Sequence, residues 1–331
     1  MKKKFFIFTI SLVILSGCIS RQKKEQTLSL SGAFALYPMV ILWADEYCKT
    51  HPDIRFNISA GGAGKGMADA LSGTVDLGMF SREILPEELD RGVWWVGLCK
   101  DAVLPTISVT NPSLEKLKQR GITHDELVAV FMERTITGWD QLLSVIPGNG
   151  FQETEAAEDV SPPADWLSEI RIYTRSDACG AAGTWAAYLG GVQEDLAGIG
   201  IHGDPGLADA VGNDPGGLGF NNTAYVYDVH TGRKYPEVEV FSLDLNENGR
   251  IDPEEDFYET LDQILEAIED KRYPSPPARE LYFVADGKPE KQAVLDFLVW
   301  VLTDGQQFVK KAGYVPLSEE QIKHYIDKLQ K

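Results

Sequence analysis

The sequence predicts a two-lobed α/β fold in which each lobe is a mixed, mostly parallel sheet flanked by helices. Short apolar runs alternate with amphipathic stretches through the first third of the chain, and a second unit of this kind begins near residue 171. Glycine-rich turns stand where two of the early runs give way to helical patterns. Such alternation is typical of parallel strands joined by covering helices.

The expected elements follow one another in a simple order. Strands are predicted at residues 28–30, 54–59, 75–80, 104–109 and 281–284, helices at 37–49, 65–71, 289–302 and from 318, and a strand-turn-helix unit at 171–189. The simplest topology makes lobe I from residues 28–107 and 283–331 and inserts lobe II, residues 108–282, between them. The chain then crosses between the lobes twice, and these crossings form a hinge.

The N-terminus has the plan of a secretory signal. Lys2, Lys3 and Lys4 precede an apolar run from Phe5 to Leu15, and small residues lead to Cys18. This ending is typical of a lipobox, whose cysteine is acylated. The sequence therefore predicts a signal peptide at 1–17, lipidation at Cys18, a tether at 18–27, and a membrane-anchored lipoprotein outside the cytoplasm.

Composition narrows the range of partners. The 331 residues carry a formal net charge of -19, which argues against nucleic acid as a partner. It does not argue against a small anion, because surface charges are screened over about 8 Å and local donors then decide binding.

Three cysteines remain after Cys18, namely Cys48, Cys99 and Cys179. An odd number leaves at least one thiol unpaired within the chain. A bridge between Cys48 and Cys99 and a set of buried free thiols both remain open.

Two glycine-rich turns are candidates for anion binding. Residues 31–35 and 61–66 each stand where a strand gives way to a helix, so backbone N–H groups point beyond the strand ends. The second turn is no phosphate-binding P-loop, because Ser59 occupies the first glycine position and Gly66 follows Lys65. The alternative is a tight turn without a ligand.

Two charged residues are further candidates, each with a structural alternative. Arg175 precedes a glycine turn and offers a planar fork of donors to an oxyanion, or else forms a salt bridge within lobe II. Asp76 lies inside an apolar run, where a carboxylate either accepts N–H groups or contacts a ligand.

Catalytic patterns are missing from the sequence. The 5 histidines are scattered without H-E-x-x-H spacing, and neither G-x-S-x-G nor C-x-x-C occurs. The sequence therefore favours a binding protein over an enzyme, and no organic cofactor is expected.

One metal motif is specific. Residues 244–255 match the EF-hand loop D-x-[DN]-x-[DN]-G-x₅-E, which predicts a structural calcium ion. An acidic turn without an ion is the alternative. The ligands would be Asp244, Asn246, Asn248, the carbonyl of Arg250, Asp252 and Glu255.

Several segments together resemble the solute-binding proteins of phosphate ABC transporters. They are residues 31–38, 61–66, 74–78, 136–142, 175–180 and 312–317, and they cover nearly the whole mature chain in order. The resemblance implies a type II periplasmic-binding-protein fold whose lobes close on a ligand. It also implies a membrane permease as partner and a monomeric receptor.

The resemblance also implies which residues face the ligand. The first loop corresponds to Ala33, Phe34 and Ala35, the second to Gly62 and Ala63, the carboxylate to Asp76, the arginine to Arg175, and the second-lobe turn to Cys179, Gly180 and Ala181. Several hydroxyl donors usual in the family are replaced here by alanine or cysteine, and Ser81, Arg82, Ser176 and Thr184 are candidates to compensate. Asp76 would accept a hydrogen bond from protonated phosphate and so reject sulfate.

The expected function is therefore that of an extracytoplasmic solute-binding lipoprotein of an ABC importer that binds phosphate or a related oxyanion between its lobes. Two alternatives stay open at this point. One is a receptor for a different small ligand, and the other is a calcium-dependent envelope sensor or interaction protein on the same fold.

Overall fold

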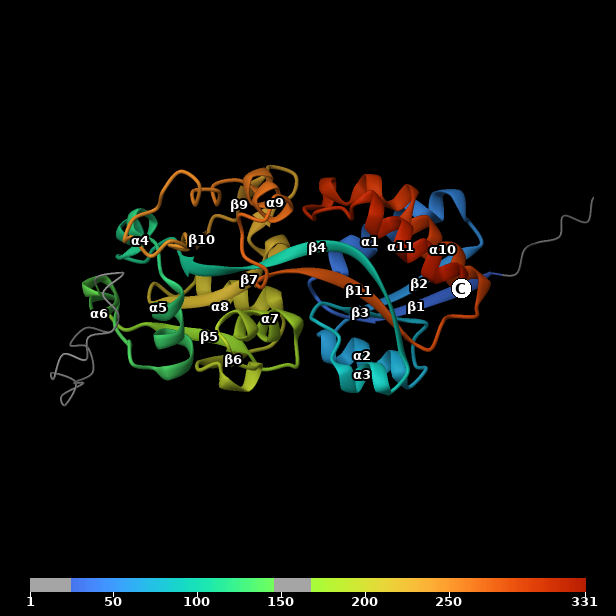
Figure 1. Cartoon of the computed structure of the whole chain (residues 1–331), viewed down its shortest axis with the longest axis horizontal. Helices are drawn as coiled ribbons and strands as arrows, with labels where there is room; N and C mark the ends of the chain where they lie inside the picture. The colour runs from blue at the N-terminus through green and yellow to red at the C-terminus, as the bar shows by residue number, and fades with distance from the viewer. Residues whose placement is uncertain (1–24, 146–167) are drawn as a thin grey trace, which may run out of the picture.

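The computed structural model describes residues 25–145 and 168–331. Within these ranges, nine strands form one continuous sheet in the order β2-β1-β3-β11-β4-β7-β5-β6, and β10 also pairs with β4. The sheet extends through two lobes that lie side by side along the long axis of the molecule (Figure 1). The expected mixed sheets flanked by helices are confirmed.

Lobe I carries three parallel strands at one end of the sheet. They are β1 (Gln26–Gly32), β2 (Ile54–Ala60) and β3 (Leu77–Phe80). Helices α1 (Tyr37–Thr50), α10 (Gln292–Leu302) and α11 (Glu319–Gln330) lie on one side of them, and α2 (Ala63–Leu71) and α3 (Pro86–Asp90) on the other (Figure 1).

Lobe II repeats the arrangement with its own parallel strands. They are β5 (Arg171–Arg175), β6 (Ile199–Ile201) and β7 (Gly217–Asn222), and β10 (Val238–Val240) lies across β4 from β7. The helices of this lobe are α4 (Leu114–Arg120), α5 (His124–Val128), α6 (Trp139–Ser144), α7 (Gly180–Tyr188), α8 (Asp204–Gly212) and α9 (Leu261–Glu269). A small hairpin joins β8 (Tyr227–Asp228) to β9 (Arg233–Lys234).

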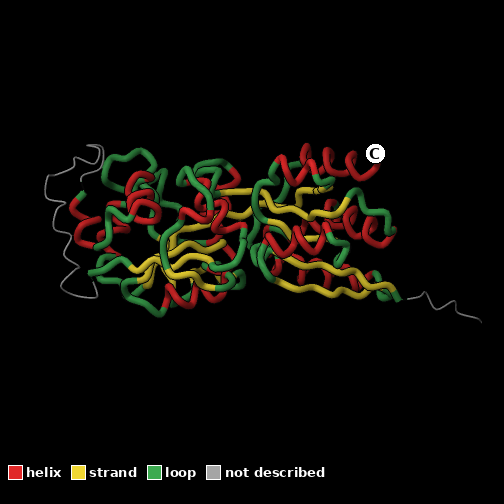
Figure 2. Tube along the Cα trace, turned by 90° about the horizontal axis from the view of Figure 1, so that it is seen from below, coloured by secondary structure: helices red, strands yellow, loops and turns green. Residues whose placement is uncertain are grey.

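Two long strands join the lobes. The 16 residues of β4 (Val93–Ser108) pair antiparallel with β11 (Ala278–Asp286) over residues 93–102 and with β7 over residues 103–107. Figure 1 shows β4 passing from one lobe to the other, and Figure 2 shows strands in both lobes with helices on either side of them. The hinge between the lobes is therefore formed by two strands, β4 and β11, that are hydrogen-bonded to each other.

Two hydrophobic cores divide the described chain. One contains residues from Leu28 to Cys99 and from Leu281 to Leu329, and the other residues from Ala102 to Ala278 together with Val315. Val103, Leu104 and Ile107, which the sequence analysis assigned to lobe I, pack in the second core. β4 is apolar on both sides of Lys100 and Asp101, so apolar character alone does not show that its two halves belong to different lobes.

Candidate functional site

The carboxyl ends of the parallel strands in the two lobes face each other across a cleft. The N–H of Gly64, in the first turn of α2, donates to the carbonyl of Ala178 in lobe II at 3.1 Å. The Tyr225 hydroxyl of lobe II donates to the carbonyl of Phe34 in lobe I at 3.0 Å. The lobes therefore touch directly in this structure, and the cleft is closed.

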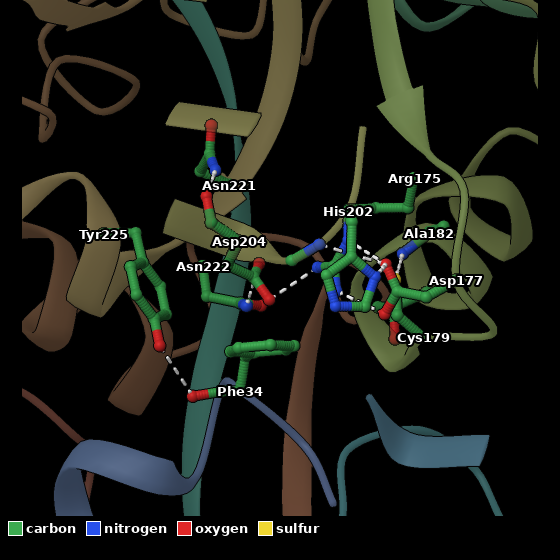
Figure 3. A network of polar contacts seen from close by, with 12 residues as sticks. Phe34, Arg175, Asp177, Cys179, Ala182, His202, Asp204, Asn221, Asn222 and Tyr225 are labelled. Atoms are coloured by element: carbon green, nitrogen blue, oxygen red, sulfur yellow. Dashed lines mark hydrogen bonds and ion pairs between the residues drawn. The ribbon is translucent and has the colours of Figure 1, made fainter. Parts of the chain in front are cut away.

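The first glycine-rich turn, residues 31–35, contributes an aromatic ring to the cleft. Ala33 and Ala35 are buried, at 1% and 2% exposure, whereas the Phe34 ring lies against lobe II. The Arg175 guanidinium stands 5.5 Å from the centre of that ring, and the His202 ring lies 6.0 Å from it (Figure 3). Phe34 therefore supports Arg175 by a cation–π contact.

The second glycine-rich turn, residues 61–66, brings its backbone close to lobe II. Gly62 has φ of 89°, and a Cβ atom there would lie 2.7 Å from Oδ2 of Asp177. Only glycine accepts both this backbone conformation and this approach. Ala63 begins α2 and is buried, and the N–H of the next residue, Gly64, is the one that donates to the carbonyl of Ala178.

Ser81 and Arg82 follow β3 at the same edge. Ser81 is 2% exposed and packs directly against Gly180 of lobe II. Arg82 binds both carboxylate oxygens of Glu88, with Nη1–Oε2 at 3.0 Å and Nη2–Oε1 at 2.7 Å, and its guanidinium lies over the ring of Phe80. The guanidinium of Arg82 is thus already paired within lobe I.

The second-lobe turn forms the start of α7. The thiol of Cys179 accepts a hydrogen bond from the N–H of Ala182, and the N–H of Cys179 donates to Oε1 of Gln193 at 3.1 Å. Burial raises the pKa of the Cys179 thiol to about 12, so it stays protonated at neutral pH. Gly180 and Ala181 occupy the first turn, where N–H groups have no partner within the helix.

Arg175 is held by two carboxylates. Its Nε and Nη2 donate to the two oxygens of Asp177 at 2.9 and 2.6 Å, and its Nη1 donates to Oδ2 of Asp204 at 2.5 Å. The Arg175 side chain is fully buried. The predicted salt bridge within lobe II is therefore present. Arg175 also approaches Phe34 at the cleft, and its role as a donor to an oxyanion stays a prediction.

The sequence analysis missed Asp204 and the buried polar network that it joins. Asn222 at the end of β7 donates to Asp204 at 2.5 Å and accepts from Arg279 of β11, which in turn pairs with Asp101 of β4 and donates to Thr184 of α7. The only available signal was position, since Asp204 begins a helix directly before a proline.

The prediction for Asp76 is wrong. Asp76 precedes β3, so it lies at the opposite end of that strand from Ser81. Its Oδ2 accepts hydrogen bonds from the backbone N–H and the hydroxyl of Ser29 at 2.8 and 2.9 Å, and it forms an ion pair with Lys291 at 3.1 Å. Asp76 is therefore a structural carboxylate that ties β3 to β1 and to the segment before α10.

The EF-hand-like loop folds around its own backbone. Glu255 and Asp244 are buried, and Glu255 accepts N–H groups from Leu245, Asn246 and Asp252, while Asp244 accepts those of Asn248 and Gly249. Asn246 and Asn248 donate to Asp252, and the exposed Arg250 pairs with it. Across residues 25–145 and 168–331, no group of three or more His, Cys, Asp or Glu side chains is arranged to hold a metal ion.

The three described cysteines, Cys48, Cys99 and Cys179, are free thiols, so the open question of a Cys48–Cys99 bridge is answered against it. Cys18, the predicted lipidation site, lies outside the described residues. No helix in the described ranges is long and apolar enough to span a membrane.

The family model that matches residues 20–305 is that of the PBP superfamily domain. The chain belongs to this superfamily. Among curated relatives, it is 25% identical to the phosphate-binding protein PstS of Methanocaldococcus jannaschii, over 94% of this chain and 90% of that one. It is also 24% identical to PstS of Pseudomonas aeruginosa PAO1, over 88% and 83% of the two chains. This PBP-superfamily chain is thus PstS-like.

Solved structures agree on the fold. A phosphate ABC transporter substrate-binding protein with bound phosphate from Clostridium perfringens superposes with a TM-score of 0.67, at 18% identity, covering 88% of this chain and all of that one. The high-affinity periplasmic phosphate-binding protein PfluDING superposes with a TM-score of 0.63 at 12% identity, covering 90% and 92% of the two chains.

Proposed function

We propose that this chain is the solute-binding receptor of an ABC importer and binds phosphate or a related oxyanion in the interlobe cleft. The supporting observation is the meeting of two helix starts and one arginine across the cleft. The first turns of α2 and α7 come together across the cleft, where the N–H of Gly64 donates to the carbonyl of Ala178, and Arg175 approaches Phe34 of the first glycine-rich turn. Helix N-termini and guanidinium groups are the donors that oxyanions prefer.

The chemistry of this cleft rests on backbone donors. Ala33, Ala63 and Ala181 carry no hydroxyl group, so the N–H groups of the turns and the N–H groups of Arg175 would make the contacts. A cavity of about 660 Å³ opens beside the second turn and the start of α7, and it is lined from both lobes by Gly64, Arg82, Cys179, Thr184 and Arg279 among others. This volume also accommodates oxyanions larger than phosphate.

Calorimetric titration with phosphate, sulfate, molybdate, tungstate and small organophosphates tests the proposal. At least one oxyanion is expected to bind and to raise the melting temperature, because a ligand specific to the native state stabilises it. Solution scattering is expected to detect compaction on binding. If no oxyanion gives heat at millimolar concentration, the receptor proposal fails.

We further propose that the protein works outside the cytoplasm, anchored by lipid at Cys18. The basic start, apolar run and small residues before Cys18 support this. Cys18→Ser is expected to leave the precursor unacylated or to release the product from the membrane fraction. Fractionation unchanged from the wild type would contradict the anchor.

The expected partner is a membrane permease that accepts ligand from a monomeric receptor. Light scattering of the purified protein tests the monomeric state. Ligand-stimulated ATP hydrolysis by reconstituted transporter tests the partner, and it separates an import receptor from an envelope sensor that transports nothing.

We also propose that residues 244–255 bind a structural calcium ion. Asp244 and Glu255 stand at the first and last positions of the loop, and their carboxylates turn inward onto loop N–H groups. Calcium would replace those N–H groups as the partner of the same oxygens. Extracellular calcium modules bind with Kd of about 10⁻⁴–10⁻³ M, so weak affinity is expected.

A further inference from the structure

The arginine at the cleft has few donors left for a ligand. A guanidinium carries five N–H donors. In Arg175, three of them go to carboxylates, two to Asp177 and one to Asp204. At most two N–H groups therefore remain for an oxyanion, unless one of the carboxylates gives up its share.

The two carboxylates differ in how firmly they hold Arg175. Asp177 takes two parallel N–H groups and also accepts the N–H of Gly203 at 3.2 Å. Asp204 takes a single N–H of Arg175 through Oδ2, and its other oxygen accepts from Asn222 (Figure 3). An incoming anion would have to replace one hydrogen bond of Arg175 at Asp204 but two at Asp177.

The buried network carries an excess of negative charge. It contains the two cations Arg175 and Arg279 and the three carboxylates Asp101, Asp177 and Asp204. With all five groups ionised, the formal charge is one negative unit before any ligand enters. An oxyanion adds to this excess in a desolvated site, where unbalanced charge is costly.

The burial of Asp204 favours its protonated form. Asp204 is 2% exposed, and its burial raises its pKa above the ordinary value, with Asp177 acting in the same direction. Arg175 of β5 and Arg279 of β11 lower that pKa. The other titratable groups around Asp204 are the phenol of Tyr225, the thiol of Cys179 and, beyond Asp177, the exposed imidazole of His202.

We propose that Asp204 couples oxyanion binding to proton uptake and so sets the charge of the ligand that the cleft accepts. This inference rests on the proposed receptor function. The anion takes the Nη1 hydrogen bond of Arg175 from Oδ2 of Asp204. Oδ2 then loses its cationic partner and binds one proton from solvent, so that one anion and one proton enter together. Asp177 keeps the guanidinium in place throughout.

The linkage has a definite sign. Because the anion raises the pKa of Asp204 further, protons are taken up in the pH range between the pKa of the free protein and that of the complex. Affinity therefore falls as pH rises through that range, by up to about tenfold per pH unit for one coupled proton. Below that range Asp204 is already protonated, and the affinity no longer depends on it.

The test is phosphate calorimetry in buffers of different ionisation enthalpy, which gives the number of protons taken up per phosphate bound. Wild type and Asp204→Asn are compared from pH 5 to 9. Wild type is expected to take up as much as one proton more per phosphate bound than the variant. The difference is compared because protonation of phosphate itself contributes equally to both counts. Asp204→Asn is expected to bind phosphate about tenfold more tightly at pH 8 and with a flatter pH profile. Asp204→Ser provides a second neutral side chain.

Asp209→Asn is the matched control. Asp209 lies on the same helix, is exposed, and contacts only Asn213 among the hydrogen bonds of its side chain in the described structure. Its proton count and pH profile are expected to equal those of wild type. Equal proton counts in wild type and Asp204→Asn, with phosphate bound by both, would overturn the coupling and leave the receptor function standing. No oxyanion binding by wild type or either Asp204 variant would overturn both.

Discussion

Asp177 binds Arg175 through both carboxylate oxygens, with distances of 2.9 Å from Nε to Oδ1 and 2.6 Å from Nη2 to Oδ2. This fork fixes the plane of the guanidinium, so that Nη1 is directed at Asp204 and the guanidinium carbon lies over the Phe34 ring. A lysine has no planar fork and reaches only one such position at a time.

Arg175→Lys is therefore expected to weaken binding of every oxyanion by at least about tenfold, since charge-assisted hydrogen bonds contribute about 1.5–3 kcal/mol. Arg171→Lys is the control, because Arg171 begins the same strand and pairs with Asp214 away from the cleft. Calorimetry measures both. Equal losses in the two variants would mean that Arg175 acts on stability and not on the ligand.

Gly180 decides whether the lobes can close. A Cβ atom at Gly180 would overlap the carbonyl and hydroxyl oxygens of Ser81 in the other lobe. Gly180→Ala is expected to keep the protein open in solution scattering and to weaken ligand binding. Gly183→Ala, on the same helix, would meet only the flexible Arg82 side chain at 3.6 Å, and it is expected to close as wild type does. Closure of Gly180→Ala to the wild-type radius would contradict this close approach.

Asp76→Asn is expected to leave the ratio of phosphate to sulfate affinity unchanged. Its ion pair with Lys291 and its bonds to Ser29 stabilise lobe I instead, so a loss of about 1 kcal/mol in the free energy of unfolding is expected. Urea denaturation measures that loss, and Lys291→Met should reproduce part of it. A shift in anion selectivity would restore Asp76 to the binding site.

Calcium binding by residues 244–255 can be tested with substitutions at two neighbouring residues, Glu254 and Glu255. Glu255→Gln is expected to abolish calcium binding, because the twelfth position of such a loop supplies a bidentate carboxylate. Glu254→Gln changes an exposed side chain next to it and is expected to bind calcium as wild type does. Calorimetry on calcium-depleted protein measures both, and heat of equal size from Glu255→Gln would rule out this ligand set.

The thiols are expected to react in order of burial. Burial raises the pKa of all three described cysteines, and Cys48 is the least buried of them. Because the thiolate is the reactive species, alkylation at neutral pH should be slow, faster at higher pH, and confined to Cys48 until the protein unfolds. Mass spectrometry after brief labelling identifies the site. Early modification of Cys99 would show that lobe I opens locally.

Local patterns in the sequence predicted the framework well. The strand-to-helix turns at residues 31–35 and 61–66 lie at the cleft as expected, because glycine turns and strand ends are properties of short segments. The extent of β4 was missed. Lys100 and Asp101 interrupt its apolar run, and only the ion pair between Asp101 and Arg279, 178 residues away, explains a charge there.

The polar site was predicted less completely, for a related reason. Asp76 and Asp204 are both carboxylates next to apolar runs, and the sequence alone does not reveal which end of a strand each occupies relative to the other lobe. That depends on long-range pairing, since Asp204 meets Arg175 from β5 and Asn222 from β7. For Arg175, the salt-bridge alternative is confirmed, and binding of an oxyanion stays a prediction.

The continuous β4 strand also determines how the protein can be divided. Its hydrogen-bonding partner changes from β11 to β7 between Ala102 and Val103, so each half of the strand belongs to the sheet of one lobe. Lys100 exchanges two further backbone hydrogen bonds with Val315, near the end of the chain. Side-chain contacts do cross this boundary, because Arg279 beside Asp101 donates to Asn222 of β7 and to Thr184 of α7. A fragment carrying one lobe alone would leave these buried polar groups without their partners, so we expect the lobes to depend on each other for stability although each has its own hydrophobic core.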